Sequence, residues 1–171
     1  MGITHVDSGI LRMFHDLGCR SMADIGCGPG GQVDKAIEIG YDALGIDGDP
    51  ALTYKNPEHY LKHDYELGPL TIDNRDLIWS CEFVEHVKPQ FVPNFIETFN
   101  CATKYIAMTF ASPNSKKAKN HKHFNEQNAD YWIDVISDYG WKYSLDLTNE
   151  AKKRSTMKRE FFRQNGLVFT K

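Results

Sequence analysis

The sequence predicts an α/β fold, built from one sheet of seven strands and the helices between them. Helix-like and strand-like segments alternate from about residue 8 to the C-terminus, and no Gly/Ser-rich or Pro-rich linker interrupts them. The length of 171 residues suits a single hydrophobic core and is too short for two full-sized domains. One domain is therefore expected.

The N-terminal half is expected to form two helices and three strands. Asp7 and Ser8 can cap the first helix, whose apolar residues fall on one face before Gly18 ends it. After a glycine-rich turn, a second helix buries its apolar face and is closed by Gly40. The strands expected in this half are 21–25, 43–46 and 60–62.

The C-terminal half is expected to add two further helices and four strands. One helix starts at about Pro89, and the next buries Trp132 and stops at Gly140. Apolar and polar residues alternate strictly from Trp141 to Leu147, which is typical of a half-buried strand. The strands expected in this half are 76–80, 105–110, 141–147 and 166–170.

The composition is that of an ordinary globular protein, with 41% hydrophobic and 25% charged residues. Lys and Arg total 20 against 23 Asp and Glu, and the net charge of -3 does not make the whole protein a polyanion binder. The four cysteines form no C-x-x-C pair, which favours reduced thiols over a zinc or redox centre. The start lacks signal-peptide character and no window approaches about 18 consecutive apolar residues. A cytoplasmic protein with no membrane partner is expected.

A glycine-rich turn, residues 24–31 (DIGCGPGG), connects the first strand to the second helix. In this position backbone amides and a helix N-terminus can meet a nucleotide-like ligand, and a Cβ would block the approach. Gly26, Gly28 and Gly31 satisfy G-x-G-x-x-G, and Asp47 lies 21 positions after Gly26. That spacing also fits a dinucleotide-binding fold.

Asp24 favours a different ligand, because a carboxylate beside a pyrophosphate is unfavourable, whereas it attracts an amino or sulfonium group. On this segment the sequence resembles the class I S-adenosylmethionine-dependent methyltransferases. The resemblance extends over most of the chain, through the segments 45–47 (GID), 63–64 (HD), 76–87 (DLIWSCEFVEHV) and 123–141.

The resemblance implies a Rossmann-like, doubly wound sheet of seven strands, mostly parallel with an antiparallel last strand, and helices on both faces. It also implies a single methyltransferase domain over residues 1–171 and S-adenosyl-L-methionine as the cofactor. Asp47 matches the carboxylate that accepts hydrogen bonds from the ribose hydroxyls, and Asp64 matches the residue that contacts the adenine amino group. The cofactor-binding residues implied in this way are Asp24, Gly26, Cys27, Gly28, Gly30, Asp47, Gly48, Asp64, Cys81 and Glu82.

Methyl transfer to oxygen needs a general base, whereas a neutral amine needs less help. The catalytic candidates are Glu82, His86 and His123. For His86 a structural hydrogen bond is the favoured alternative, and for His123 a loop-anchoring role has equal weight. His121 and His123 offer two nitrogen ligands without a nearby carboxylate or Cys pattern, so no metal is expected.

One basic segment follows the fifth strand, and a second basic segment precedes the last strand. In the resembled fold both leave the carboxyl edge of the sheet, where ligands enter. They suggest an anionic acceptor, although such charge runs are usually solvated faces. The basic residues are Lys116, Lys117, Lys119, Lys122, Lys152, Lys153, Arg154, Lys158, Arg159 and Arg163.

The leading hypothesis is a methyltransferase that acts on oxygen or nitrogen of a small molecule, with the anionic or neutral character of the acceptor left open. The alternatives are an RNA or protein methyltransferase, with nucleic acid the less favoured acceptor, and a non-catalytic S-adenosylmethionine-binding partner subunit. The oligomeric state is left open.

Overall fold

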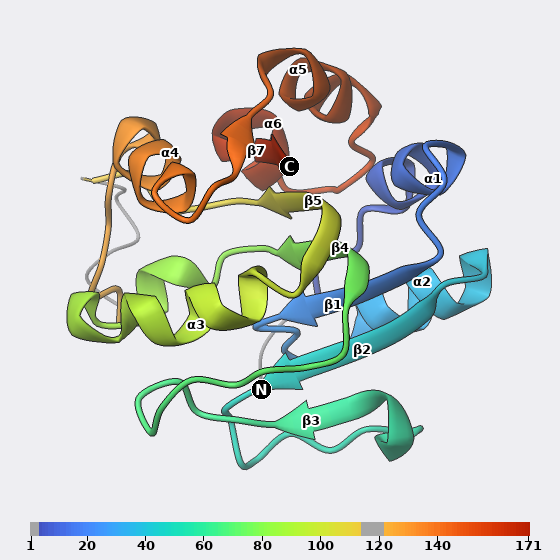
Figure 1. The fold of residues 1–171 in the computed structure, drawn as a ribbon. Coiled ribbons are helices and arrows are strands. Elements are labelled where there is room, and N and C mark those ends of the chain that lie inside the picture. The colour runs from blue at the N-terminus through green and yellow to red at the C-terminus, as the bar shows by residue number, and fades with distance from the viewer. Residues whose placement is uncertain (1–3, 114–121) are drawn as a thin grey trace.

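The computed structural model describes residues 4–113 and 122–171. Its centre is a seven-stranded sheet in the order β3-β2-β1-β4-β5-β7-β6 (Figure 1). Strands β1 to β5 pair in parallel, and β7 runs antiparallel to both β5 and β6. The expected α/β sheet with an antiparallel last strand is confirmed. The strands are β1 (Ser21–Ile25), β2 (Asp42–Asp47), β3 (Tyr60–Lys62), β4 (Arg75–Ser80), β5 (Ala102–Met108), β6 (Lys142–Tyr143) and β7 (Leu167–Thr170).

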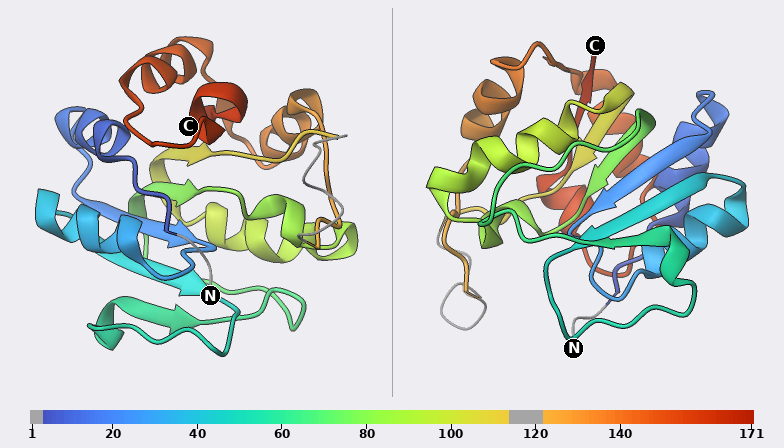
Figure 2. Two further views of the ribbon diagram at one scale, coloured as in Figure 1. Left: turned by 180° about the vertical axis from the view of Figure 1, so that it is seen from behind. Right: turned by 60° about the horizontal axis from the view of Figure 1, so that its bottom comes forward.

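Helices cover both faces of the sheet, as expected (Figure 2). Side chains alternate along β4, so Ile78 packs with α3 and α4 while Leu77 and Trp79 pack with α1, α2, α5 and α6. No helix within residues 4–113 and 122–171 has the length and apolar character needed to cross a bilayer. The helices are α1 (Ser8–Asp16), α2 (Gly31–Ile39), α3 (Val92–Phe99), α4 (Ala129–Ser137), α5 (Leu145–Arg154) and α6 (Phe161–Asn165), with short 3-10 turns η1 (Pro57–His59), η2 (Val84–His86) and η3 (Pro89–Phe91).

The strand order changes direction between β1 and β4. The chain starts at β1 in the middle of the sheet, adds β2 and β3 on one side, and then crosses to β4 on the other side. Connections after the carboxyl ends of β1 and β4 therefore diverge and leave a crevice between them. The glycine-rich turn follows β1 there, and Cys81 and Glu82 follow β4.

The expected strand over 141–147 is wrong beyond its first residues. Strand β6 holds only Lys142–Tyr143, and α5 begins two residues later. Ser144 is the reason: its side chain accepts a hydrogen bond from the amide of Leu147 and caps the helix. Leu145 is consequently exposed rather than on the buried face of a strand.

Asp7 joins three segments near the carboxyl edge of the sheet. Its buried carboxylate caps α1 by accepting from the amide of Ile10 at 3.1 Å. It also accepts from Ser155 Oγ at 2.5 Å and from the amide of Thr156 at 3.0 Å. The amide of Asp7 donates to Gln32 Oε1 at 2.8 Å. A single side chain thus ties the start of α1 to the end of α5, and its amide orients a side chain of α2.

Replacing this carboxylate should destabilise the whole fold. Asp7→Ala removes a helix cap and leaves buried donors without partners, which together should lower the free energy of unfolding by about 2–4 kcal/mol. Urea unfolding followed by circular dichroism measures the change. Ser8→Ala is the matched control, because its hydroxyl lies in an exposed contact with Thr156. A loss in Asp7→Ala no larger than in Ser8→Ala would contradict this role.

Candidate functional site

The glycine-rich turn is held against β2 and opens toward a cavity. The amides of Gly26 and Cys27 both donate to the carbonyl of Ile46, at 2.8 and 3.1 Å. Gly28 has a φ of 51°, in the left-handed region, and a Cβ built on it would meet nothing within 4 Å. The missing side chain of Gly28 therefore leaves open space beside the turn for a ligand.

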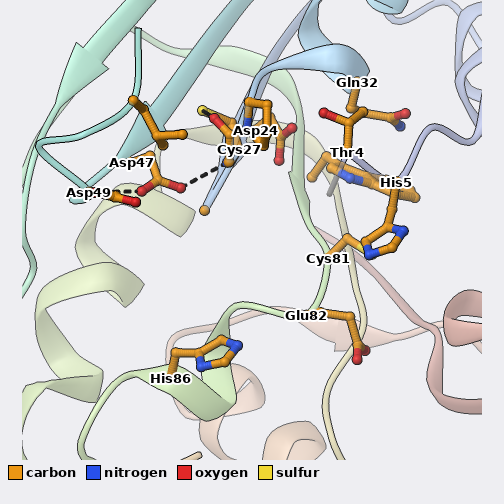
Figure 3. A pocket seen from close by; sticks show the side chains of 15 residues that line it. Thr4, His5, Asp24, Cys27, Gln32, Asp47, Asp49, Cys81, Glu82 and His86 are labelled. Atoms are coloured by element: carbon orange, nitrogen blue, oxygen red, sulfur yellow. Dashed lines mark hydrogen bonds between the residues drawn. The ribbon is translucent and has the colours of Figure 1, made fainter. Parts of the chain in front are cut away.

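Two adjoining cavities follow the carboxyl edge of the sheet, with volumes of about 520 and 490 Å³. This is the size range of small-molecule and cofactor sites. Both are lined by Asp47, Glu82 and His86, so they form one continuous groove. Figure 3 shows the first cavity, with Asp24 and Asp47 on one side and Glu82 and His86 facing them across it.

Asp24 and Gln32 give the first cavity opposite chemical characters at two points. Asp24, at the end of β1, is 3% exposed, and burial together with the charge of Asp47 raises its pKa to about 8. Gln32 Oε1 accepts from Asp7, which leaves Nε2 as the buried donor, and within the described residues Nε2 has no hydrogen-bond partner. The cavity thus offers an acid for a cation and an amide donor for an anion.

Asp47 is fixed at the end of β2 by backbone amides. Its Oδ2 accepts from Gly28 at 2.8 Å and its Oδ1 from Asp49 at 2.9 Å, as the dashed lines in Figure 3 show. Each carboxylate oxygen has a further lone pair that can accept from a ligand hydroxyl. A Cβ on the next residue, Gly48, would lie 3.1 Å from the carbonyl of His63, so the loops after β2 and β3 pack closely.

Of the ten cofactor-binding residues implied by the resemblance, nine line this groove and Gly30 does not. Asp64 is exposed and lines the second cavity beside Phe83. Among the described lining residues of both cavities, Gly30 does not occur, and a Cβ there would overlap the ring of Tyr60. The remaining residues line one or both cavities: Asp24, Gly26, Cys27, Gly28, Asp47, Gly48, Cys81 and Glu82.

Glu82 has an unusual backbone for a residue with a side chain. Its φ is 54°, a left-handed conformation that costs free energy outside glycine. Thr109, just past β5, stabilises this conformation, since its hydroxyl accepts from the Glu82 amide at 2.8 Å and donates to Glu82 Oε1 at 3.0 Å. Glu82 lines both cavities from this strained turn.

The two histidine candidates meet beside this turn. The rings of His86 and His123 lie edge to face with centroids 4.8 Å apart. His123 Nδ1 is 2.7 Å from Glu126 Oε1. Glu85 is fully buried, and this burial, with a further contribution from Glu82, raises its pKa to about 8. His121 lies outside the described residues.

Sequence reasoning missed Gln32 and Glu126. The only sequence signal for Glu126 is its position three residues after His123, which suits a local pair. Gln32 gives no local signal, because a distant amide orients its side chain.

The basic residues do not all serve the groove. Arg154 pairs with Glu150 and Asp16, and Arg163 with Glu160 and the carbonyls of residues 155 and 157. Lys158 and Arg159 line a third cavity of about 380 Å³, which shares Thr4 and His5 with the first. Lys122 lines the second cavity, and Lys116, Lys117 and Lys119 lie outside the described residues.

No protein-family model matches the sequence, and no curated protein matches it. Solved structures do. Magnesium protoporphyrin IX methyltransferase from Synechocystis PCC 6803, crystallised with bound SAH, superposes with a TM-score of 0.65 at 14% identity over 95% of this chain and 79% of that one. A TehB-like SAM-dependent methyltransferase from Corynebacterium glutamicum gives a TM-score of 0.65 at 19% identity over 95% and 87% of the two chains.

A SAM-dependent methyltransferase from Archaeoglobus fulgidus gives a TM-score of 0.60 at 17% identity, over 96% of this chain and 92% of that one. The chain therefore has the fold of the SAM-dependent methyltransferases. Its glycine-rich turn and groove lie at the crevice where the strand order reverses, which is where α/β folds of this kind bind ligands.

Burial of Asp24 should make stability depend on pH. The folded protein binds the Asp24 proton more tightly than the unfolded chain, because the pKa rises from 3.8 to about 8 on folding. The free energy of unfolding should thus decrease as pH rises from about 4 to about 8. Asp24→Asn removes this contribution, and its urea-unfolding free energy should decrease less over the same range.

Glu85 contributes in the same direction in both proteins, so the difference between wild type and variant isolates Asp24. Asp64→Asn is the matched control, since its carboxylate is exposed at the same edge of the sheet, and it should keep the wild-type slope. Parallel curves for wild type and Asp24→Asn would contradict the buried state of this acid.

Proposed function

We propose that the protein is an S-adenosylmethionine-dependent methyltransferase that acts on a small molecule at oxygen or nitrogen. The observation that carries the proposal is that Asp24 and Gln32 line the same cavity, beside the glycine turn that leaves open space at Gly28. An amino-acid moiety has an ammonium group and a carboxylate, which suit a buried acid and a buried amide donor respectively. The methyltransferase fold supports the same ligand.

The groove offers sites for the other parts of this cofactor. We assign the ribose hydroxyls to Asp47, because each of its carboxylate oxygens has a lone pair left that can accept a hydrogen bond. We assign the adenine to the second cavity, with Asp64 and Phe83. Gly48, Cys81 and Gly28 form walls without charge. The cofactor supplies the methyl carbon and its leaving group, and the chain has to position the acceptor and exclude water.

Proton removal from an oxygen acceptor falls to groups around Glu82. Glu82 lines both cavities, and its strained turn and its hydrogen bonds with Thr109 fix the side chain. His86 also lines both cavities, and His123 packs against it. These three residues are the catalytic candidates, with Glu82 the one best supported as a general base.

A small acceptor agrees with the dimensions of the groove, and an anionic one agrees with Lys158 and Arg159 in the third cavity, which shares Thr4 and His5 with the first. The residues 1–171 would act as one methyltransferase domain. RNA or protein as acceptor, and a non-catalytic cofactor-binding subunit, are the alternatives. The strained Glu82 speaks against the non-catalytic one, since such strain clusters at active sites.

Cofactor binding tests the first step. S-adenosylmethionine and S-adenosylhomocysteine should bind in calorimetric titrations, and NAD should not. Asp47→Ala should weaken the affinity at least tenfold, because charge-assisted hydrogen bonds contribute about 1.5–3 kcal/mol each. Asp73→Ala is the matched control at the opposite edge of the sheet and should bind as wild type. Tight NAD binding without a response to S-adenosylhomocysteine would refute the proposal.

An acceptor screen, with S-adenosylhomocysteine as the measured product, tests the second step. For an anionic acceptor, the double variant Lys158→Ala/Arg159→Ala should raise KM about five- to tenfold with little change in cofactor affinity. Lys152→Ala/Lys153→Ala removes the same charge from α5 and serves as the control. Equal KM values in both double variants, together with turnover that ignores salt, would favour a neutral acceptor.

A further inference from the structure

We infer that Glu85, His86 and His123 form a binding site for a divalent transition-metal ion at the side of the groove that His86 lines. Each residue offers one ligand atom, and these atoms all lie within 4.8 Å of one another. Two imidazoles and one carboxylate are a ligand set that proteins use for zinc and for iron(II), with further positions left open. The inference does not depend on methyl transfer, since an ion would bind here without cofactor or acceptor.

The state of Glu85 is the first independent observation. Its side chain is 0% exposed, and within the described part of the chain no donor makes a well-formed hydrogen bond to either carboxylate oxygen, although the amides of Glu85 and Ala111 lie close enough to stabilise the carboxylate weakly. A buried acid without well-formed hydrogen bonds is costly unless a cation or donor compensates it. His86 and His123 lie next to it and are half-buried or exposed, so a cation held by all three groups would satisfy the carboxylate.

The orientation of the two histidines is the second observation. His123 Nδ1 is 2.7 Å from Glu126 Oε1, and His86 Nδ1 is 3.4 Å from the carbonyl of Lys122. With each Nδ1–H donating to its oxygen, the lone pair of each ring is on Nε2. Metal-binding histidines commonly donate their other ring N–H to a carboxylate or a backbone carbonyl in this way.

Backbone hydrogen bonds bring the ligands together from distant parts of the chain. The carbonyl of Glu85 accepts from the amides of Phe124 and Asn125 at 2.8 and 3.1 Å. These two bonds fix the segment after residue 122 against η2, which carries Glu85 and His86. Zinc with bonds of about 2.0–2.2 Å needs ligand atoms about 3.4 Å apart. Side-chain rotations that move the ligand atoms by about 1 Å would bring them to that separation.

The place of the cluster determines what the ion could reach. His86 lines both cavities of the groove, so an open coordination position would face the space that leads to Glu82. Water or an oxygen atom of a small molecule is the natural further ligand at such a position. No metal is expected from His121 and His123 alone; the folded chain brings Glu85 and His86, which lie far from His123 in the sequence, next to it.

Metal titration of the full-length protein tests the site. After dialysis against EDTA and removal of the chelator, Co²⁺ should produce ligand-field absorption bands that saturate at one ion per chain, and Zn²⁺ should abolish them. Glu85→Gln and His123→Ala should each weaken Zn²⁺ binding at least tenfold, and Glu126→Gln about tenfold through the orientation of His123. His59→Ala, before β3 at the opposite edge of the sheet, is the matched control and should bind as wild type.

Thermal unfolding separates loss of the site from loss of the fold. Glu85→Gln replaces a buried ionisable group by a neutral one of the same shape, so the metal-free variant should unfold at the same or a higher temperature than wild type. Zn²⁺ should raise the unfolding temperature of wild type but not of this variant. The inference is overturned if Co²⁺ gives no saturating bands, or if Zn²⁺ binds wild type, Glu85→Gln and His123→Ala equally.

Discussion

Four carboxylic acids lie near one another at the carboxyl edge of the sheet. The free-energy cost of burying and ionising them constrains which ligands can bind there. Asp24 and Glu85 are almost fully buried, and Asp47 and Glu82 line the groove between them. Burial raises the pKa values of Asp24 and Glu85 to about 8, and the neighbouring carboxylates Asp47 and Glu82 add charge repulsion to that effect. A cationic ligand at either end would relieve the repulsion. The proposed ammonium group would lie beside Asp24, and the proposed metal ion would be held by the cluster of Glu85, His86 and His123.

The fold maintains this arrangement through contacts that do not themselves touch a ligand. Asp7 fixes Gln32 from one side of the groove, and Thr109 fixes the strained backbone of Glu82 from the other. Both contacts depend on the core on each face of the sheet, because α1 and β5 position them. Stability and binding are therefore coupled. The packed core compensates for the strained backbone of Glu82 and for the buried acids, and a bound cationic ligand would stabilise those acids further.

Local sequence patterns predicted much of the site. The strand-turn-helix spacing identified the glycine turn, and the ends of three parallel strands placed Asp24, Asp47 and Glu82 at one edge. Features that depend on contacts between distant segments could not be predicted from local patterns. Strict alternation over 141–147 suggested a strand, but the cap at Ser144 starts a helix. The same limit applied to Gln32, and to the Glu85 cluster, because only the folded chain brings its ligands together.

Proton release on cofactor binding tests the central claim most directly, because it reports the buried acid and the cationic ligand together. At pH 6.5 Asp24 should be mostly protonated in the free protein, with its pKa of about 8, and a bound ammonium group would lower that pKa. Calorimetric titration of S-adenosylmethionine in two buffers of different ionisation enthalpy should give a release approaching one proton in wild type and none in Asp24→Asn. Binding without proton release in wild type, or no binding at all, would contradict the account.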